Sequence, residues 1–164
     1  MIKKWSILFP LMPVVFLSAC AIGPKYDISG VDFSNTPQRV VEGDVAQGTQ
    51  VLWGGLIISS ANLKSITRFE ILAYPLDSNQ KPRTDEMPLG RFLAQHEGYL
   101  EIADYAQGRI ITVAGKVLGK TIGTIDKSEY TYPVVNIDRH YLWGRRGNAP
   151  ESSIHFGIGV MLHN

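Results

Sequence analysis

Alternation of apolar and polar residues with a period of two is the dominant pattern between residues 50 and 143, and it predicts β-strands. The clearest run is TRFEILAY at 67–74, which puts Phe69, Ile71 and Ala73 on one face. Because successive side chains of a strand point to opposite sides, we expect that face to be buried. Similar runs predict further strands at 51–58, 90–96, 109–118 and 130–137.

Glycine and proline add detail to these strands. Gly54 or Gly55 should bend the first strand, and Gly115 should make a bulge or bend in the fourth. Pro133 has no N–H to give to a ladder, so it puts the last strand at an edge or a bulge. A turn is expected between Gly119 and Gly123.

A short helix is predicted at residues 99–105 (YLEIADY), between the third and fourth strands. The resulting order of three strands, a helix and two strands is that of an OB-fold, a five-stranded partly open barrel. We therefore predict a mostly β, small OB-like barrel with one short helix. The alternative is a generic antiparallel sandwich. Four residues are expected at inward positions of the core: Ile71, Ile111, Val113 and Val135.

The N-terminus has the layout of an export signal. Lys3 and Lys4 precede an apolar core, and the sequence Leu-Ser-Ala-Cys closes it at residues 17–20. That tetrapeptide resembles the lipobox of bacterial lipoproteins, which implies cleavage before Cys20 and a diacylglyceryl group on its sulfur. Ala21, rather than Asp, then favours the outer membrane. The alternatives are an ordinary signal with a chance cysteine and an uncleaved anchor.

The chain is thus divided into a signal peptide (1–19), a lipidated cysteine and tether (20–49), the barrel (50–143), and a linker with a C-terminal strand (144–164). The tether is rich in Gly, Pro, Asp and Ser, with one short apolar element at Val40. In the last segment, residues 154–162 alternate perfectly and need a partner strand. We expect that partner to be the barrel itself, another copy or an envelope protein.

Charge argues against nucleic acid as a partner. The chain has 16 basic and 15 acidic residues, and removing Lys3 and Lys4 with the signal leaves 14 basic residues. A nearly neutral body offers no electrostatic footprint for phosphate backbones.

Candidate chemistry is sparse, so we expect no enzyme, no cofactor and no metal site. The four histidines, His96, His140, His155 and His163, have no spacing typical of zinc ligands, and we interpret them as unrelated. Glu70, Asp77 and Asp104 could act as acids or bases, yet no motif brings two of them together. Glu70 is expected to form cross-strand pairs with Arg68 or Arg91.

Five aromatic residues are the possible binding residues: Trp53, Tyr74, Tyr130, Tyr132 and Trp143. OB-folds use such side chains as stacking platforms for oligonucleotides or sugars. The favoured interpretation is nevertheless that they are core and edge residues, because no basic stripe accompanies them.

Several segments resemble one bacterial family. They are WGGLI at 53–57, TRFEILAYPLDSNQKP at 67–82, GRFLAQHEGYL at 90–100, GRIITVAGKVLG at 108–119 and YTYPVVNIDRHYLW at 130–143. Their order resembles that of the Slp family, the starvation-inducible outer-membrane lipoproteins of Gram-negative bacteria. Where that family often has an Asp-Pro pair, this chain has residues 101–104 (EIAD).

The resemblance implies a lipoprotein of the outer membrane and supplies no activity or catalytic residues. We therefore expect a non-enzymatic, membrane-anchored protein that faces the periplasm. Its expected role is structural, or interaction with envelope components under starvation or stationary-phase stress. The alternative is a periplasm-facing binding module that takes a small molecule or glycan on the barrel face.

Overall fold

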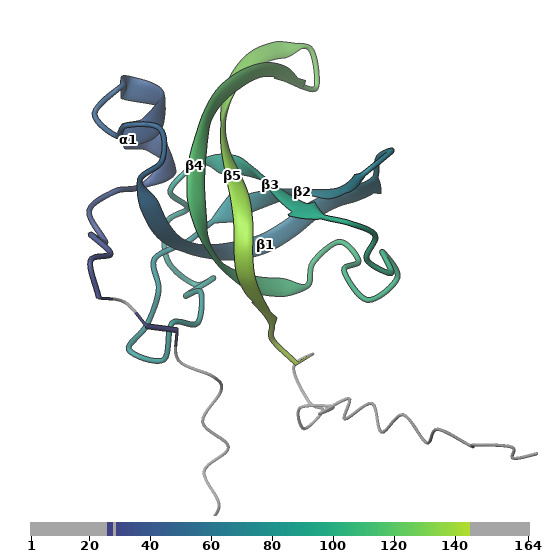
Figure 1. Ribbon diagram of the computed structural model, residues 1–164, viewed down its shortest axis with the longest axis horizontal. Helices are drawn as coiled ribbons and strands as arrows, with labels where there is room; N and C mark the ends of the chain where they lie inside the picture. The colour runs from purple at the N-terminus through teal and green to yellow at the C-terminus, as the bar shows by residue number, and fades with distance from the viewer. Residues whose placement is uncertain (1–25, 28, 145–164) are drawn as a thin grey trace, which may run out of the picture.

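Five strands and one short helix make up the described chain, and Figure 1 labels them. The computed structural model describes residues 26–27 and 29–144. The elements follow in the order α1 (Pro37–Glu42), β1 (Gln50–Asn62), β2 (Ile66–Ala73), β3 (Arg91–Glu97), β4 (Ile110–Ile125) and β5 (Ser128–Leu142). All five predicted strands are present.

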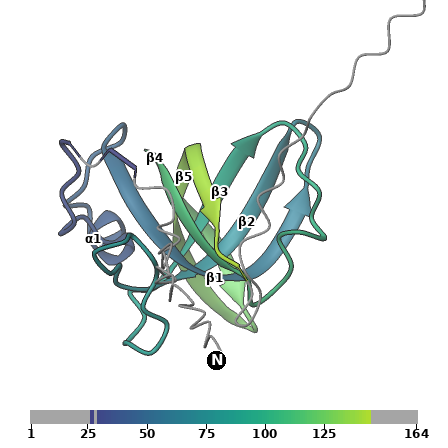
Figure 2. The ribbon, with the colours of Figure 1, turned by 90° about the horizontal axis from the view of Figure 1, so that it is seen from below.

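The strands form a closed barrel in the order β1-β2-β3-β5-β4, with β4 returning to pair with β1. All pairs are antiparallel except β3 with β5, which are parallel and share only three residue pairs. This topology is the OB-like barrel that the sequence predicts. Figure 2 shows the strands crossing around a common interior, with α1 to one side.

The barrel interior is filled by the inward positions of the alternating runs. Ile71, Ile111 and Val135 are 0% exposed and Val113 is 1% exposed, so all four predicted core positions are confirmed. Trp53 joins the same core cluster.

Two glycines, one in β1 and one in β4, lie where a neighbouring backbone approaches closely. A Cβ at Gly55 would overlap the carbonyl of Leu72, and one at Gly115 would overlap the carbonyl of Asn136. The register of β4 against β5 shifts between Ala114 and Gly115, which confirms the predicted bulge. Only glycine permits these close approaches, so the two positions set the curvature of the barrel.

The predicted turn between Gly119 and Gly123 is wrong, because β4 continues to Ile125. A two-residue turn at 126–127 follows, with Asp126 in the left-handed region at φ 55°. From Gly119 onward β4 pairs only with β5, so the two form a hairpin that rises beyond the other strands in Figure 1. Pro133 lies on this hairpin, one residue before the pairing of β5 with β3 begins, and its edge position is confirmed.

The predicted helix at residues 99–105 is also wrong, because this segment forms turns. Side chains of β1 and β2 form hydrogen bonds with the backbone of this segment instead. Thr67 Oγ1 accepts a hydrogen bond from Leu100 N at 2.9 Å, and Ser60 Oγ donates to the carbonyl of Tyr105 at 2.6 Å. The Tyr105 ring packs on Phe69, with centroids 5.0 Å apart. These tertiary contacts outweigh the weak helix preference of a seven-residue run.

The described helix lies within the predicted tether. Thr36 caps α1, Pro37 begins it, and Gly43 ends it in the left-handed region at φ 94°. Val40 and Val45 are 2% and 8% exposed and belong to the core cluster. The prediction of a tether up to residue 49 is therefore wrong from the helix onward, because apolar burial ties this part to the barrel.

The signal segment, Cys20 and the alternating run at 154–162 lie outside the described residues. Within the described ranges, no helix has both the length and the apolar character needed to cross a bilayer.

Candidate functional site

A groove of about 250 Å³ lies on the outer face of β2 and β3. The end of β1 borders it on one side, and the projecting β4–β5 hairpin borders it on the other. We call it the β2–β3 groove. It is lined by Ser59, Ala61, Arg68, Glu70, Leu93, Thr121, Ile122, Gly123, Thr124 and Tyr132.

Glu70 is the centre of a hydrogen-bond network in this groove. Its Oε1 accepts from Arg91 Nη1 at 2.7 Å and from the Tyr132 hydroxyl at 3.1 Å. Ser59 Oγ donates to Oε2 at 3.4 Å. The Arg91 and Glu70 side chains are 27% and 19% exposed. The expected cross-strand pair of Glu70 with Arg91 is therefore confirmed, and the carboxylate is held in one orientation.

The electrostatics of the groove follow from this network. The hydrogen bond to Glu70 raises the pKa of Arg91 above its usual value, so the guanidinium stays charged. Burial, followed by the neighbouring carboxylate, raises the pKa of Tyr132. The Tyr132 phenol therefore keeps its proton and acts as a donor to Glu70.

The hairpin side of the groove combines hydroxyl groups with an apolar surface. Thr121 and Thr124 are exposed, and Ile122 is 67% exposed. Tyr130 supports the floor, because its hydroxyl accepts from Arg91 N at 2.8 Å and its ring lies 4.7 Å from that of Tyr132. Tyr130 thus contacts both Arg91 and Tyr132 at the floor of the groove, and Thr121, Ile122 and Thr124 form its accessible rim.

The five aromatic candidates do not share one surface. Tyr130 and Tyr132 lie together beside the β2–β3 groove, whereas Trp53 and Tyr74 both line a different pocket. Trp53 is 7% exposed, and its Nε1 donates to the carbonyl of Asn35 at 2.6 Å. Trp143 donates to Thr112 Oγ1 at 2.9 Å, on another part of the barrel.

Tyr74 belongs to a second, more apolar pocket of about 330 Å³ near α1. Leu52, Trp53, Leu76 and Leu89 also line this pocket. Residues 33 and 35–37, at the start of α1, complete the lining, and no charged side chain lines this pocket.

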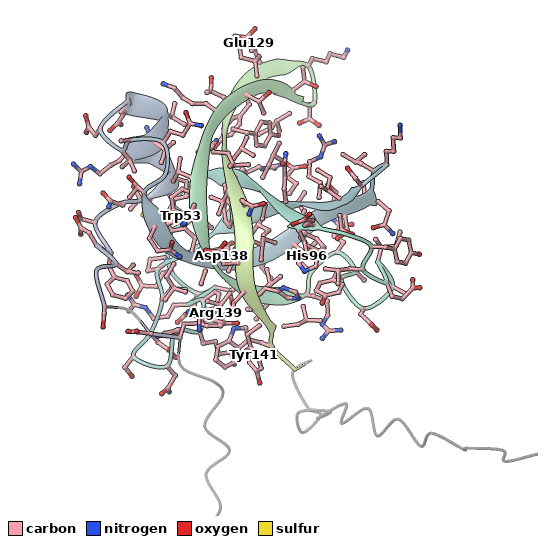
Figure 3. All side chains as sticks on the ribbon, viewed as in Figure 1. Trp53, His96, Glu129, Asp138, Arg139 and Tyr141 are labelled. Atoms are coloured by element: carbon pink, nitrogen blue, oxygen red, sulfur yellow. The ribbon has the colours of Figure 1, made fainter. Side chains whose placement is uncertain are left out.

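His96 and His140, which we interpreted from the sequence as unrelated, lie together. The rings of His96 and His140 are 5.4 Å apart, and the Tyr105 hydroxyl is 2.8 Å from His140 Nε2. Burial, followed by the neighbouring His96, lowers the pKa of His140. Figure 3 places His96 and Trp53 on opposite sides of β5. His96 lies on β3 and His140 on β5, two neighbouring strands of the barrel, and no spacing in the sequence signals this contact.

Within residues 26–27 and 29–144, no three His, Cys, Asp or Glu side chains gather to hold a metal ion. His155 and His163 lie outside these ranges.

The three carboxylate candidates stay apart. Asp77 closes its own loop by accepting from Asn79 N at 2.7 Å and Lys81 N at 2.9 Å. Asp104 lies in the turns at 98–109, and Glu70 lies in the groove.

The chain is similar to several bacterial proteins over part of its length. It is 31% identical over 120 residues to the uncharacterized lipoprotein YeaY of Escherichia coli, covering 73% of this chain and 58% of that protein. It is 34% identical over 99 residues to the outer membrane protein Slp of Escherichia coli, covering 60% and 52%. An uncharacterized protein of Haemophilus influenzae is 35% identical over 91 residues, covering 55% and 49%. The chain thus spans about half the length of these relatives.

The chain also matches two solved structures weakly, at low sequence identity. Mitochondrial single-stranded DNA binding protein Rim1 of Saccharomyces cerevisiae matches with a TM-score of 0.38 and 14% identity, over 58% of this chain and 94% of that one. A small single-stranded DNA-binding protein of Streptomyces coelicolor matches with a TM-score of 0.38 and 11% identity, over 62% and 100%. The assignment of the barrel depends on its strand order, not on these matches.

Family membership follows from the length of a further match. Residues 17–159 match the family described as Outer membrane lipoprotein Slp family, which is most of the chain. The chain belongs to the Slp family of outer membrane lipoproteins.

Proposed function

We propose that this protein is anchored in the outer membrane by lipid on Cys20, and that its periplasm-facing barrel binds an envelope component without catalysing a reaction. The β2–β3 groove is the binding site. The family assignment and the lipobox-like residues 17–20 support the anchor. A role under starvation or stationary-phase stress is the physiological setting we propose for it.

The observation that carries the proposal is the carboxylate of Glu70, fixed in an open groove by Arg91 and Tyr132. A preorganised polar group in a concave site costs little ordering entropy when a ligand binds. The face of strands 2 and 3, with the loops beside it, is also where OB-folds bind oligonucleotides and oligosaccharides.

The composition of the groove favours a polar small molecule or a glycan. Four of its lining side chains carry hydroxyls: Ser59, Thr121, Thr124 and Tyr132. Its volume of about 250 Å³ suits one ring-sized unit of a longer ligand, because pockets for drug-sized ligands measure roughly 300–1,000 Å³. The nearly neutral body argues against a nucleic acid.

A binding experiment tests the groove. The full-length lipoprotein in detergent micelles is titrated with saccharide fragments released from Gram-negative envelopes, and binding is followed by NMR shifts of the groove amides. Glu70→Gln should weaken binding, because it removes the charge that Arg91 and Tyr132 orient. Glu129→Gln is the matched control, since Glu129 is exposed at the outer end of the hairpin (Figure 3). Equal binding by both variants would contradict the groove assignment.

A separate experiment tests the anchor. Cys20→Ala should abolish incorporation of labelled lipid and move the protein from the membrane to the soluble or precursor fraction. Ser18→Ala keeps a small residue at its position and should remain lipidated. Unchanged membrane fractionation of Cys20→Ala would exclude the proposed anchor.

A further inference from the structure

We infer that the β2–β3 groove selects an acidic saccharide unit, with the sugar carboxylate on Arg68 and the sugar hydroxyls on Glu70 and the rim. This inference rests on the proposed function of the groove and names its ligand class.

The charge balance of the groove is the first support. The groove has two cations and one anion. Arg91 is paired with the anion Glu70 at 2.7 Å, and Arg68 lines the same face. In the described ranges, the three ion pairs join Arg39 to Asp44, Arg83 to Glu86, and Arg91 to Glu70. Arg68 takes part in none of them, and it is exposed. The groove therefore carries one positive charge in excess, on a guanidinium whose planar fork suits a carboxylate.

The hydroxyl groups of the rim are the second support. Thr121 and Thr124 are exposed, and within the part of the chain that the structure describes their hydroxyls make no side-chain hydrogen bond. Ser59 makes only a long contact of 3.4 Å to Glu70. Each hydroxyl can donate and accept, which matches the mixed demand of sugar hydroxyls. Ile122, 67% exposed, offers an apolar surface to the C–H face of a sugar ring.

Other ligands fit the groove less well. Tyr132 is 5% exposed, so no open aromatic face is available there for stacking a nucleobase. A phosphate would carry about two charges against one free guanidinium. A neutral sugar would leave Arg68 without a partner.

A matched pair of ligands tests the selectivity. D-glucuronate and D-glucose differ in one carboxylate on the same ring, and D-glucose 6-phosphate carries a phosphate there instead. Each is titrated into the full-length protein in micelles, with NMR shifts of groove amides as the readout. Glucuronate should bind about tenfold more tightly than glucose, which corresponds to about 1.4 kcal/mol.

Variants show whether Arg68 is responsible. Arg68→Gln should bring glucuronate affinity down to the affinity that the same variant has for glucose. Lys127→Gln removes an exposed charge at the hairpin turn, outside the lining, and should change neither affinity. The melting temperature of Arg68→Gln should match the parent, because the side chain is exposed.

The outcomes separate the two proposals. Equal affinity for glucose and glucuronate, retained preference in Arg68→Gln, or tighter binding of glucose 6-phosphate would overturn the carboxylate selectivity alone. The carboxylate selectivity would also be overturned if a neutral envelope saccharide shifted the NMR signals of the groove amides and glucuronate did not. If no saccharide of any kind shifts the groove amides, the proposed function falls together with the selectivity.

Discussion

Thr67 holds the turns at 98–109 against the barrel, and replacing it should be costly. The side chain is 0% exposed. Its Oγ1 accepts from Leu100 N at 2.9 Å and lies 2.6 Å from Asn62 Oδ1 and 3.1 Å from the carbonyl of Gly98. The hydroxyl thus accepts one hydrogen bond and donates its single proton to one of two acceptors, Asn62 Oδ1 at 2.6 Å or the Gly98 carbonyl at 3.1 Å.

The magnitude follows from the groups that lose their partners. Thr67→Val keeps the shape of the side chain but leaves the Leu100 N–H without an acceptor and Asn62 without a donor. A buried group that loses its only partner costs about 1–3 kcal/mol. Because Leu100 and Asn62 are half-buried, water recovers part of this, and we expect a total loss of about 2–3 kcal/mol.

Thr67→Ser is the matched control. It keeps the hydroxyl and removes one methyl, which should cost about 1 kcal/mol. The free energies of unfolding are compared by urea titration, and hydrogen exchange of the Leu100 amide reports the local contact. If Thr67→Val is as stable as Thr67→Ser, or the Leu100 amide stays equally protected, the hydroxyl does not hold this segment.

Three further predictions concern the core, a bulge and pH. Ile111→Ala should lower the free energy of unfolding by about 2–5 kcal/mol, whereas Leu118→Ala, 42% exposed, should change it little; equal urea midpoints would refute the burial argument. Gly115→Ala should cost about 1–3 kcal/mol through overlap with the Asn136 carbonyl, and a melting temperature equal to the parent would contradict that overlap. The pKa of His140 is lowered in the fold from its usual 6.5, so the folded state binds fewer protons. Its contribution to stability should therefore decrease as pH falls below about 6.5, and His140→Phe should show a smaller drop in melting temperature from pH 7.5 to 5; an equal drop would exclude His140 as the cause.

Local patterns predicted the strands well. Alternation in residues 67–74 identifies both the strand and its buried face, because a one-residue shift would expose Phe69 and Ile71 to water. The same logic located Ile111 and Val135 in the core. The strand order then indicated the barrel, although no single strand pairing could be read from the chain.

Prediction failed where distant contacts decide a local conformation. Residues 99–105 have some helical character, but Thr67 and Ser60 offer better partners for their backbone. Conversely, the Gly-, Pro-, Asp- and Ser-rich composition predicted a tether where the structure has α1, capped by Thr36 and Gly43. A six-residue helix is unstable alone. Burial of Val40 in the core cluster stabilises it.

For the candidate site, the sequence predicted that Glu70 pairs with Arg68 or Arg91, since neighbouring strands bring opposite charges together, and the structure shows that the partner is Arg91. Only the tertiary structure decided that Tyr132 joins them, that the β4–β5 hairpin forms a wall, and that His96 meets His140. Each of these depends on how β5 passes between β3 and β4. Periodicity along one strand reports which face is buried, but it contains no information on which strand lies beside it, and a binding groove is made by such neighbours.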